Sequence, residues 1–472
     1  MQSVGPETSK GRGMLLSLVC VAQFINVLSV TVVIVALPEI QRDLRFSESS
    51  LQWVVSIYAL FFGGFLMLSG RAADLYGRRR LFLLGLGLFS VAALACALST
   101  TSTVLIAARA IQGMGAAVAV PSALSLLTTS FTDARARERA LGVWTAAAAG
   151  GGATGFFLGG LVTGSVGWRW VFVLNVPIGL AGIVVGLALL APDGGERVDT
   201  SLDLAGALTV TGGLAALILG FTRAQVEGFD ALNSFLVGGG VALLVAFGVI
   251  ERTASDPLIP PQAYRSRRVV GANLVAFSVT AVTSPASVIG SLYLRRILDF
   301  SAASTGLIFA PFSIAVIVGS FAGARFTSRL GPRPTIAAGL VVIGAAMVVT
   351  SLIDVGGGAP FLLTGMALSG LGLGCASVPA TAVGTAAVEE AEQGVASGLL
   401  NTAAQVGTAV GIGALVTLAA ARTSALAGSS PASPAQLLSG YRSALLTGAA
   451  LAGAALIGAL VLIRARQGRP IS

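Results

Sequence analysis

The chain has 472 residues, of which 55% are hydrophobic and 10% are charged, and it contains 61 glycines and no histidine. A water-soluble protein carries about 25% charged residues, so this composition excludes a water-soluble globule. Because a bilayer core requires about 20 apolar residues per helix, the sequence predicts an all-α polytopic membrane protein. The net charge of +9 is typical either of nucleic-acid binding or of basic loops beside a membrane.

Apolar segments of spanning length follow one another along the chain, separated by charged or turn-rich breaks. The first segment is too long for a signal peptide and lacks a small-residue cleavage site, so we expect it to span the membrane. The sequence predicts fourteen spans, at 14–38, 51–70, 81–99, 104–129, 139–164, 170–191, 203–221, 233–250, 269–294, 304–325, 335–352, 359–386, 394–420 and 443–463.

The basic residues are distributed unequally between alternating loops. With a cytoplasmic N-terminus, the inside segments hold 20 Lys and Arg residues and the outside loops hold 8. This asymmetry follows the positive-inside rule and explains the basic balance without a nucleic-acid partner. We therefore expect a multi-pass protein of the cytoplasmic cell membrane with both termini in the cytoplasm.

Signals of catalysis or metal binding are weak in this sequence. Cys20, Cys96 and Cys375 each lie inside an apolar run without ligand spacing, which disfavours disulfides and metal sites. Carboxylates are not clustered, and no GxxxxGK[ST] sequence occurs, which disfavours an enzyme and an ATP-driven pump. We expect no metal and no cofactor, with a proton gradient as the energy source.

The first two spans carry uncharged polar groups. Gln23, Asn26 and Ser29 lie in the first span, and Tyr58 lies in the second with other aromatic residues. Such a surface suits a bulky amphipathic molecule with few fixed charges. We expect these four residues to line the pathway of a substrate or a proton.

A glycine- and arginine-rich loop follows the second span and has a counterpart after the tenth. Its candidate functional residues are Gly70, Arg71, Asp74, Gly77, Arg78 and Arg79. The register of the two copies pairs Arg71 with Arg325, Gly77 with Gly331 and Arg79 with Arg333. Duplicated helical halves are typical of transporters, so we expect the first six helices to repeat as the last six.

This repeat predicts the domain organisation. Spans 7 and 8 become an insert between two six-helix bundles, and a duplicated chain can work as a monomer. The predicted parts are a tail at 1–13, the first bundle at 14–191, the insert with its flanks at 192–268, the second bundle at 269–463 and a tail at 464–472.

The loop after the second span has two interpretations. Glycine at positions 70 and 77 permits a tight turn, and Asp74 can accept hydrogen bonds from arginines or from a helix N-terminus. Such a latch would hold the inward-facing gate shut until the halves rock. Alternatively, the loop is a basic segment that sets topology and carries a solvated aspartate. Ser328 replaces the aspartate in the second copy, which should latch weakly if at all.

Arg109 lies within the fourth span, where an arginine is costly unless it faces a wet cavity or a partner. Gln112 follows at i+3 on the same helical face. The pair is either a group that binds substrate or shifts a neighbouring pKa, or a structural arginine that snorkels outward. The second half has no counterpart, because Met366 stands four residues before Gly370 as Arg109 stands before Gly113.

Two further spans carry small or amide side chains at helical spacing. Gly151, Gly155 and Gly159 form a GxxxGxxxG stripe in the fifth span, which predicts a close helix–helix interface. In span 13, Asn401 and Gln405 share one face and are either pathway groups or helix-pairing amides.

Four segments together resemble the major facilitator superfamily, in particular its fourteen-helix drug:proton antiporters of the QacA/EmrB type. The segments are the loop 70–80, the RAIQG sequence at 109–113, the glycine stripe of span 5 and the WRWVFVLNVPIG sequence at 168–179. Phe156 replaces the proline that is usual in the span 5 motif. The resemblance implies the major facilitator fold, two six-helix bundles plus two inserted central helices, and a role for Arg109 in proton coupling.

The first span departs from that pattern, because Ser29 stands where the subfamily normally carries an aspartate. A proton-coupled pump needs a group that protonates reversibly. The remaining candidate acids are Glu39 and Asp43 near the outer mouth, Asp203 at the entry of span 7 and Asp74 in the loop after span 2, and none is clearly buried at mid-membrane. The leading hypothesis is an exporter of drugs or other amphipathic molecules by alternating access in exchange for protons; the alternative is a lipid or natural-product flippase, or a facilitator without conventional proton coupling.

Overall fold

The computed structural model describes most of the chain as helices joined by short turns, with no strand among the residues that it describes. Those residues are 9–46, 51, 53–193, 203–227, 230–253, 259, 265–300, 308–357, 359–389, 393–428 and 432–463. Within them, thirteen helices are long and apolar enough to cross a membrane, and Ala205–Phe221 is a shorter apolar helix in the place of the seventh predicted span. The prediction of an all-α polytopic fold is therefore confirmed.

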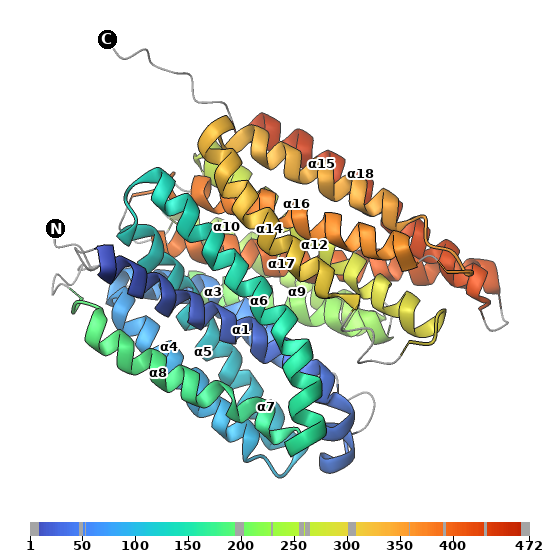
Figure 1. Cartoon of the computed structure of the whole chain (residues 1–472), viewed down its shortest axis with the longest axis horizontal. Helices are drawn as coiled ribbons and strands as arrows, with labels where there is room; N and C mark the ends of the chain where they lie inside the picture. Colours follow the sequence, from blue (N-terminus) through green and yellow to red (C-terminus); the bar gives the residue numbers. More distant parts are fainter. Residues whose placement is uncertain are drawn as a thin grey trace.

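The first half contains the helices coloured blue to green in Figure 1. They are α1 (Ser9–Leu44), α3 (Trp53–Tyr76), α4 (Arg78–Ala97), α5 (Ser102–Ser130), α6 (Ala134–Val166), α7 (Arg169–Val173) and α8 (Asn175–Leu189). Two of these helices begin at side-chain caps, because Thr101 accepts from Val104 N and Asp133 accepts from Ala136 N. The sixth predicted span is thus divided into α7 and α8.

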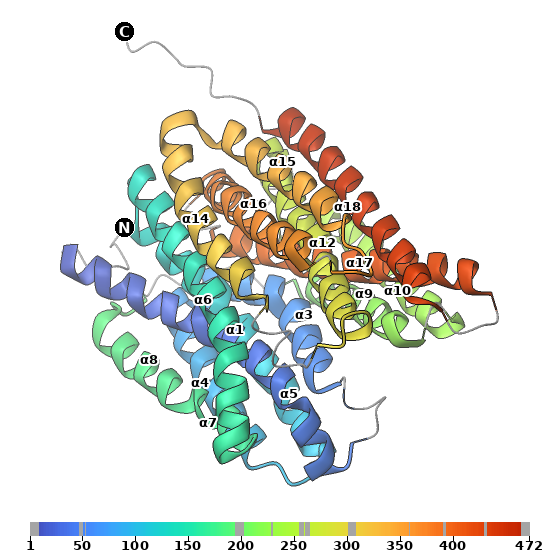
Figure 2. The ribbon, with the colours of Figure 1, turned by 45° about the vertical axis from the view of Figure 1, so that its right-hand side comes forward.

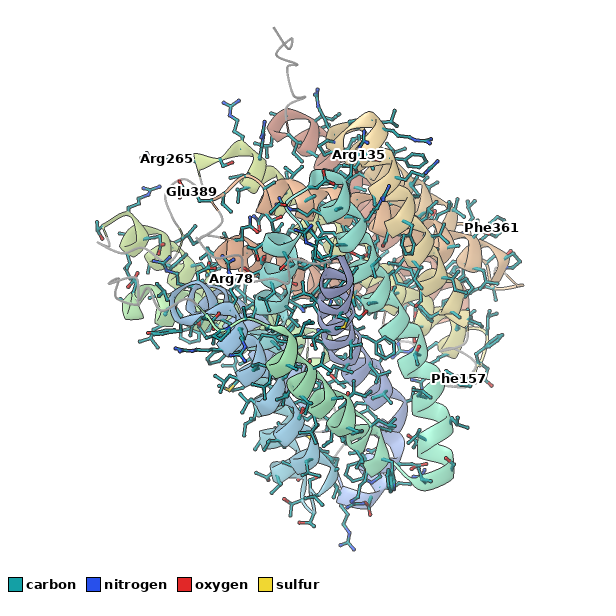
Figure 3. All side chains as sticks on the ribbon, turned by 60° about the vertical axis from the view of Figure 1, so that its left-hand side comes forward. Arg78, Arg135, Phe157, Arg265, Phe361 and Glu389 are labelled. Carbon is teal, nitrogen blue, oxygen red and sulfur yellow. The ribbon has the colours of Figure 1, made fainter. Side chains whose placement is uncertain are left out.

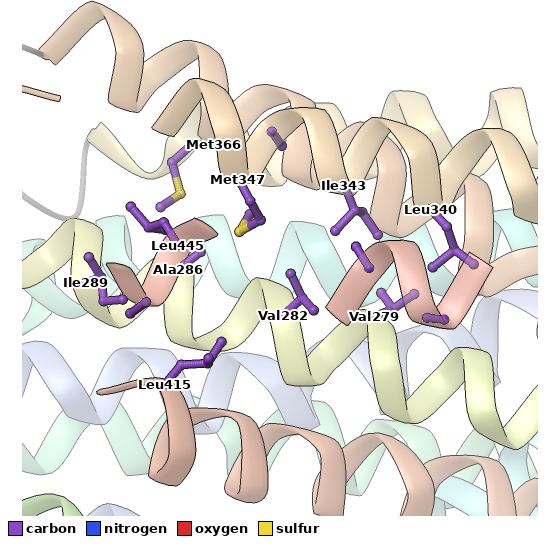
Figure 4. Packing of buried hydrophobic residues seen from close by; sticks show 14 of the residues in the cluster. Val279, Val282, Ala286, Ile289, Leu340, Ile343, Met347, Met366, Leu415 and Leu445 are labelled. Atoms are coloured by element: carbon purple, nitrogen blue, oxygen red, sulfur yellow. The ribbon is translucent and has the colours of Figure 1, made fainter. Parts of the chain in front are cut away.

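The second half contains the yellow to red helices. They are α12 (Arg267–Arg296), α14 (Ala310–Leu330), α15 (Pro332–Thr350), α16 (Ala359–Thr385), α17 (Gln393–Ala427) and α18 (Pro434–Leu462). Their buried core joins Val279, Val282 and Ile289 of α12 to Ile343 and Met347 of α15 (Figure 4). At the start of α18, Ser433 and Gln436 form a capping box.

Corresponding glycines bring corresponding helices together in the two halves. A methyl group on Gly85 of α4 would lie 2.5 Å from Ala119 N of α5, and one on Gly339 of α15 would lie 2.8 Å from Ala376 N of α16. The tight turns before α4 and α15 both use glycine at positive φ, 102° at Gly77 and 90° at Gly331. We call the end of the bundle that carries these two turns the Gly77 end.

The insert consists of α9 (Leu204–Glu227) and α10 (Ala231–Thr253), which pack on each other through Gly213 and Gly240. Helix α9 contacts both halves, because Gly64 of α3 faces Thr211 and Gly413 of α17 faces Phe221. Figure 2 shows α9 beside α17. The insert is therefore packed where the two halves meet.

Two further helix pairs join the halves. Gly142 of α6 packs on Ser320 of α14, and Gly398 of α17 packs on Leu66 and Gly70 of α3. The absence of side chains at these glycines lets the backbones approach closely. Both contacts lie toward the Gly77 end, so the halves are closed against each other there.

Candidate functional site

Arg109 is the centre of a buried polar cluster in the first half. Its side chain lies on α5 and is 0% exposed. The Nε donates to the backbone oxygen of Val54 at 2.9 Å, and Nη1 donates to Gln112 Oε1 at 2.8 Å and to the backbone oxygen of Ser29 at 3.4 Å. The guanidinium therefore ties α5 to α1 and α3.

Tyr58 of α3 closes the cluster on one side. Its ring centroid lies 4.3 Å from the guanidinium carbon of Arg109, within the range of a cation–π contact. The Tyr58 hydroxyl donates to Asn26 Oδ1 at 2.5 Å, and its ring stacks with Phe62 at a centroid distance of 6.1 Å. The aromatic face and the carbonyl oxygens thus supply the negative potential that a buried cation needs.

A carboxylate counterion for Arg109 is missing from the part of the chain that the structure describes. The two ion pairs found there join Arg78 to Asp74 and Arg169 to Asp43. Arg109 Nη2 and Gln112 Nε2 are buried donors without a hydrogen-bond partner in the same part of the chain. The cluster therefore presents free N–H donors on two side chains and a positive charge without a paired carboxylate among the described residues, which favours an acceptor or an anion.

The predicted pathway residues fall into two groups. The structure brings Arg109, Gln112, Asn26, Ser29 and Tyr58 together in the buried cluster. The other three lie outside its hydrogen bonds. Gln23 on α1 has a buried Oε1 without a partner in the described part of the chain. On α17, Asn401 donates to Ser397 O and Gln405 packs against Gly63 of α3.

Asp74 joins the two halves at the Gly77 end. Its Oδ1 accepts from Arg78 Nη2 at 3.3 Å and Nε at 3.4 Å, and its Oδ2 accepts from the backbone N–H of Val395 at 2.9 Å. Figure 3 labels Arg78. Val395 lies in the first turn of α17, where N–H groups are unsatisfied and the helix dipole favours negative charge. One carboxylate thus accepts from both an arginine and a helix N-terminus.

Asp193 is a part of this loop that the sequence analysis missed. Its two carboxylate oxygens accept from the backbone N–H groups of Arg79 at 3.1 Å and Arg80 at 3.0 Å, at the start of α4. A methyl group on Gly77 would collide with this carboxylate. The only signal was an acidic residue directly after Pro192, in a stretch that we had assigned to the flank of the insert.

The second copy of the loop keeps the turn and loses the link between halves. Arg333 Nη2 donates to Leu460 O at 2.9 Å, just as Arg79 Nη2 donates to Leu187 O at 3.2 Å. Ser328, which replaces the aspartate, donates its hydroxyl to Arg325 O within its own helix.

The glycine stripe of α6 lies against α1. A methyl group on Gly151 would lie 2.5 Å from Phe24 O, one on Gly155 would collide with Thr31, and one on Gly159 would lie 2.9 Å from Val32 O. The backbones of α6 and α1 are thus in direct contact along the stripe. Helix α1 is the helix that also carries Asn26 and Ser29.

At the end opposite Gly77, Asp43 is held by two partners. It accepts from Arg169 Nη1 at 2.5 Å and from Trp168 Nε1 at 2.9 Å. These hydrogen bonds, the one from Arg169 first, lower the pKa of Asp43 below its usual value. Asp43 is therefore charged and paired at neutral pH, which makes it a poor carrier of an exchangeable proton.

Two six-helix halves that pack against each other, the first of which buries a cationic cluster, are typical of a polytopic membrane transporter. Residues 19–412 match the model of the Major Facilitator Superfamily. The chain belongs to the major facilitator superfamily.

Several known proteins similar to this chain are resistance or export proteins of bacteria. It is 37% identical over 470 residues to the puromycin resistance protein pur8 of Streptomyces alboniger, which covers 98% of this chain and 93% of that protein. It is 38% identical over 440 residues to the cephamycin export protein CmcT of Amycolatopsis lactamdurans, covering 91% and 88%. It is 32% identical over 405 residues to the multidrug resistance protein Stp of Mycobacterium tuberculosis (strain CDC 1551 / Oshkosh), covering 85% and 75%.

Among solved structures, the human organic anion transporter MFSD10 (TETRAN) has a TM-score of 0.68 at 16% identity, covering 95% of this chain and 99% of that chain. This likeness supports the fold, and it confirms the prediction of a major facilitator architecture.

Proposed function

We propose that this chain exports drugs or other amphipathic small molecules across the cytoplasmic membrane by alternating access, in exchange for protons. The observation that carries the proposal is the hydrogen bond from Val395 N–H to Asp74, because it closes one end of the interface between the halves with a contact that can break. With both termini in the cytoplasm, the Gly77 end is the cytoplasmic gate and the structure is closed to the cytoplasm. We assign the chain to the fourteen-helix antiporter subfamily. It acts as a monomer.

The substrate class follows from the buried cluster and from the relatives. Proteins named for puromycin resistance, cephamycin export and multidrug resistance support a bulky organic substrate. The cluster offers N–H donors on Arg109 and Gln112 and an aromatic face on Tyr58. We therefore expect neutral or anionic amphiphiles to be exported in preference to dications, which Arg109 would repel.

A facilitator or flippase without proton coupling is the second candidate. It is favoured by Ser29, whose backbone oxygen touches Arg109 at the place where the antiporter subfamily normally carries an aspartate. Without an acid beside Arg109, the usual proton carrier is missing from this cluster, so the direction of transport would follow the substrate gradient alone.

Uptake of a fluorescent neutral amphiphile into inside-out vesicles separates the two candidates. Proton exchange predicts accumulation that requires an acidic lumen and collapses when a protonophore is added. Uptake to simple equilibrium, indifferent to the gradient and to the protonophore, would establish the facilitator instead.

Substrate charge preference is tested by returning a carboxylate to the first span. In Ser29→Asp the new side chain neutralises Arg109, so we expect export of a dicationic dye to rise about tenfold relative to a neutral amphiphile. Ser17→Asp, on the same helix but hydrogen-bonded to Gly13 O at an exposed site, is the matched control. Preferential export of the dication by the unmodified protein would contradict the proposal.

A further inference from the structure

Glu251 is a buried acid that the sequence analysis did not consider. It lies in the last turn of α10 and is 5% exposed. Its Oε1 accepts a short hydrogen bond from the backbone N–H of Ile259, and its Oε2 is buried without a partner in the described part of the chain. A buried carboxylate with one unsatisfied oxygen requires a counter-charge or a proton.

Asp203 supplies a second carboxylate at the same end of the insert. It directly precedes α9, and its Oδ1 caps that helix by accepting from Gly206 N–H at 2.8 Å. Its Oδ2 is also buried and has no partner among the described residues. Ala207, one turn after Asp203, and Phe247, one turn before Glu251, belong to one buried cluster, so the two acids lie at the same end of the α9–α10 pair. Each acid carries one buried oxygen without a partner among the described residues.

The basic residue that α3 places at this end is Arg71, which stands one turn after Met67, a residue packed in the same buried cluster as Phe247 of α10. Arg71 stands three residues before Asp74, the carboxylate that joins α3 to Val395. On the other elements packed here, the arginines of α10 and α12, Arg252, Arg267 and Arg268, are exposed.

The acids are also connected to the latch through apolar packing. Phe247 of α10 and Ile259 belong to one buried cluster with Met67 of α3, Val269 of α12 and Val395 of α17. This cluster contains residues of both halves and of the insert. It lies where Asp74 of α3 accepts the hydrogen bond from Val395 N–H of α17. A change of charge at Glu251 therefore acts on the same group of helices that the latch holds.

We propose that Glu251 and Asp203 form a shared proton-binding site at the Gly77 end of the α9–α10 insert, and that Arg71 links its charge to the Asp74 latch. The inference rests on the proposed proton exchange and names the group that carries the proton in place of the absent aspartate of the first span. One proton bound at this site neutralises one of two acids whose buried oxygens have no partner among the described residues, and it leaves one negative charge for Arg71. Release of that proton leaves two negative charges, which draw Arg71 of α3 toward the insert.

The test uses the full-length protein reconstituted in proteoliposomes. Glu251→Gln and Asp203→Asn remove the titratable oxygen and keep the acceptors for Ile259 N–H and Gly206 N–H. The control is Glu389→Gln, an exposed acid just before α17 (Figure 3). Two assays are compared: accumulation of a neutral fluorescent amphiphile driven by an acidic lumen, and counterflow exchange of the same amphiphile without a gradient.

We expect both amides to lower gradient-driven accumulation by about tenfold or more while counterflow stays within about twofold of the unmodified protein. Glu251→Asp, which keeps a titratable group, should restore part of the gradient-driven uptake. In lightly buffered detergent solution, proton release on adding the amphiphile should disappear in Glu251→Gln and persist in Glu389→Gln.

Unchanged gradient-driven uptake in Glu251→Gln would overturn the site, and so would an equal loss of both assays, which would mark a structural role. A different result speaks against the proposed function itself: if the unmodified protein accumulates nothing in response to the gradient, proton exchange fails whatever the variants do.

Discussion

The two six-helix halves share a backbone frame and differ in the chemistry placed on it. Arg79 and Arg333 each donate to a backbone oxygen of the last helix of their half, Leu187 O and Leu460 O. At the opposite end, Arg169 donates to Ser99 O at 3.2 Å, and Arg442 donates to Ile353 O at 2.8 Å. These repeated contacts lie at the two ends of each bundle, so they fix the frame and leave its middle free to diverge.

The middle of each half shows the divergence. Gly113 packs on the backbone of Tyr58 in the first half, and Gly370 packs on the backbone of Phe312 in the second. Four residues before these glycines stand Arg109, in a polar cluster, and Met366, which is 2% exposed in an apolar core. At this pair of equivalent positions, the first half thus carries a polar cluster with free N–H donors and the second half carries apolar packing.

The largest expected effect on the transport rate comes from Arg109, compared with Met366 at the equivalent position of the second half. Arg109→Ala removes the positive charge, the cation–π contact and three hydrogen bonds, so we expect transport to fall by about 100-fold or more. Met366→Leu changes an apolar side chain for one of similar volume and should leave transport within about twofold. Initial rates of amphiphile uptake, corrected for the amount of folded protein, measure both; equal rates would show that the polar cluster is structural.

The latch provides the next effect. Asp74→Ala removes the acceptor for Val395 N–H and the partner of Arg78, and a lost charged hydrogen bond of this kind is worth about 1.5–3 kcal/mol. We expect the cytoplasmic gate to open more readily and the transport rate to change by about tenfold. Ser328→Ala, at the equivalent position, removes a hydrogen bond within one helix and should change little. Similar behaviour of the two variants would refute the assignment of the latch to the first half.

The turns before α4 and α15 sharpen the comparison. Alanine at Gly77 or Gly331 must adopt a positive φ, which costs about 1–3 kcal/mol in either half. A methyl group at Gly77 would also displace Asp193, whereas one at Gly331 has no atom within 4 Å. Gly77→Ala should therefore melt at a lower temperature than Gly331→Ala in the same detergent. The reverse order would mean that Asp193 does not cap α4.

The smallest expected effect is the loss of stability at low pH. Arg169 pairs with a carboxylate, whereas Arg442 bonds only to the neutral oxygen of Ile353 in the described part of the chain. Because the pKa of Asp43 is lowered by folding, its contribution is present above the unfolded value of about 3.9 and is lost as pH falls through the lower folded value. For an exposed pair we expect about 0.2–1 kcal/mol.

Melting temperatures of the unmodified protein and of Asp43→Asn therefore differ slightly at neutral pH, and the difference should vanish below about pH 3. A difference that grows in acid would reverse the assigned direction of the pKa shift.

Much of this arrangement could be predicted from the sequence, for reasons that are local. Apolar length fixed the spans, and the matching positions of Gly77 and Gly331 revealed the repeat because a tight turn tolerates few other residues. Arg109 was conspicuous because an arginine inside an apolar run demands a partner. The glycine stripe of α6 indicated an interface, although α1 as its partner depended on the tertiary fold.

The parts that could not be predicted depend on contacts between distant segments. Asp193 caps α4 from more than 100 residues away, a separation that no spacing rule covers. Glu251 stands at the end of a span without any motif around it, and its burial accompanies the packing of Phe247 and Ile259 in one cluster with residues of α3, α9, α12 and α17. Asn401 and Gln405 share a helical face as expected, but that face meets α3 and not the Arg109 cluster.

The most direct test of the account is a distance measurement between the halves at the Gly77 end. Spin labels at two exposed arginines, Arg135 of α6 and Arg329 of α14, report whether the halves separate there. We predict a short distance in the unmodified protein, a larger population at long distance in Asp74→Ala, and no change in Ser328→Ala. A single short distance in all three proteins, with and without the amphiphile, would contradict alternating access through a latch that only the first half carries.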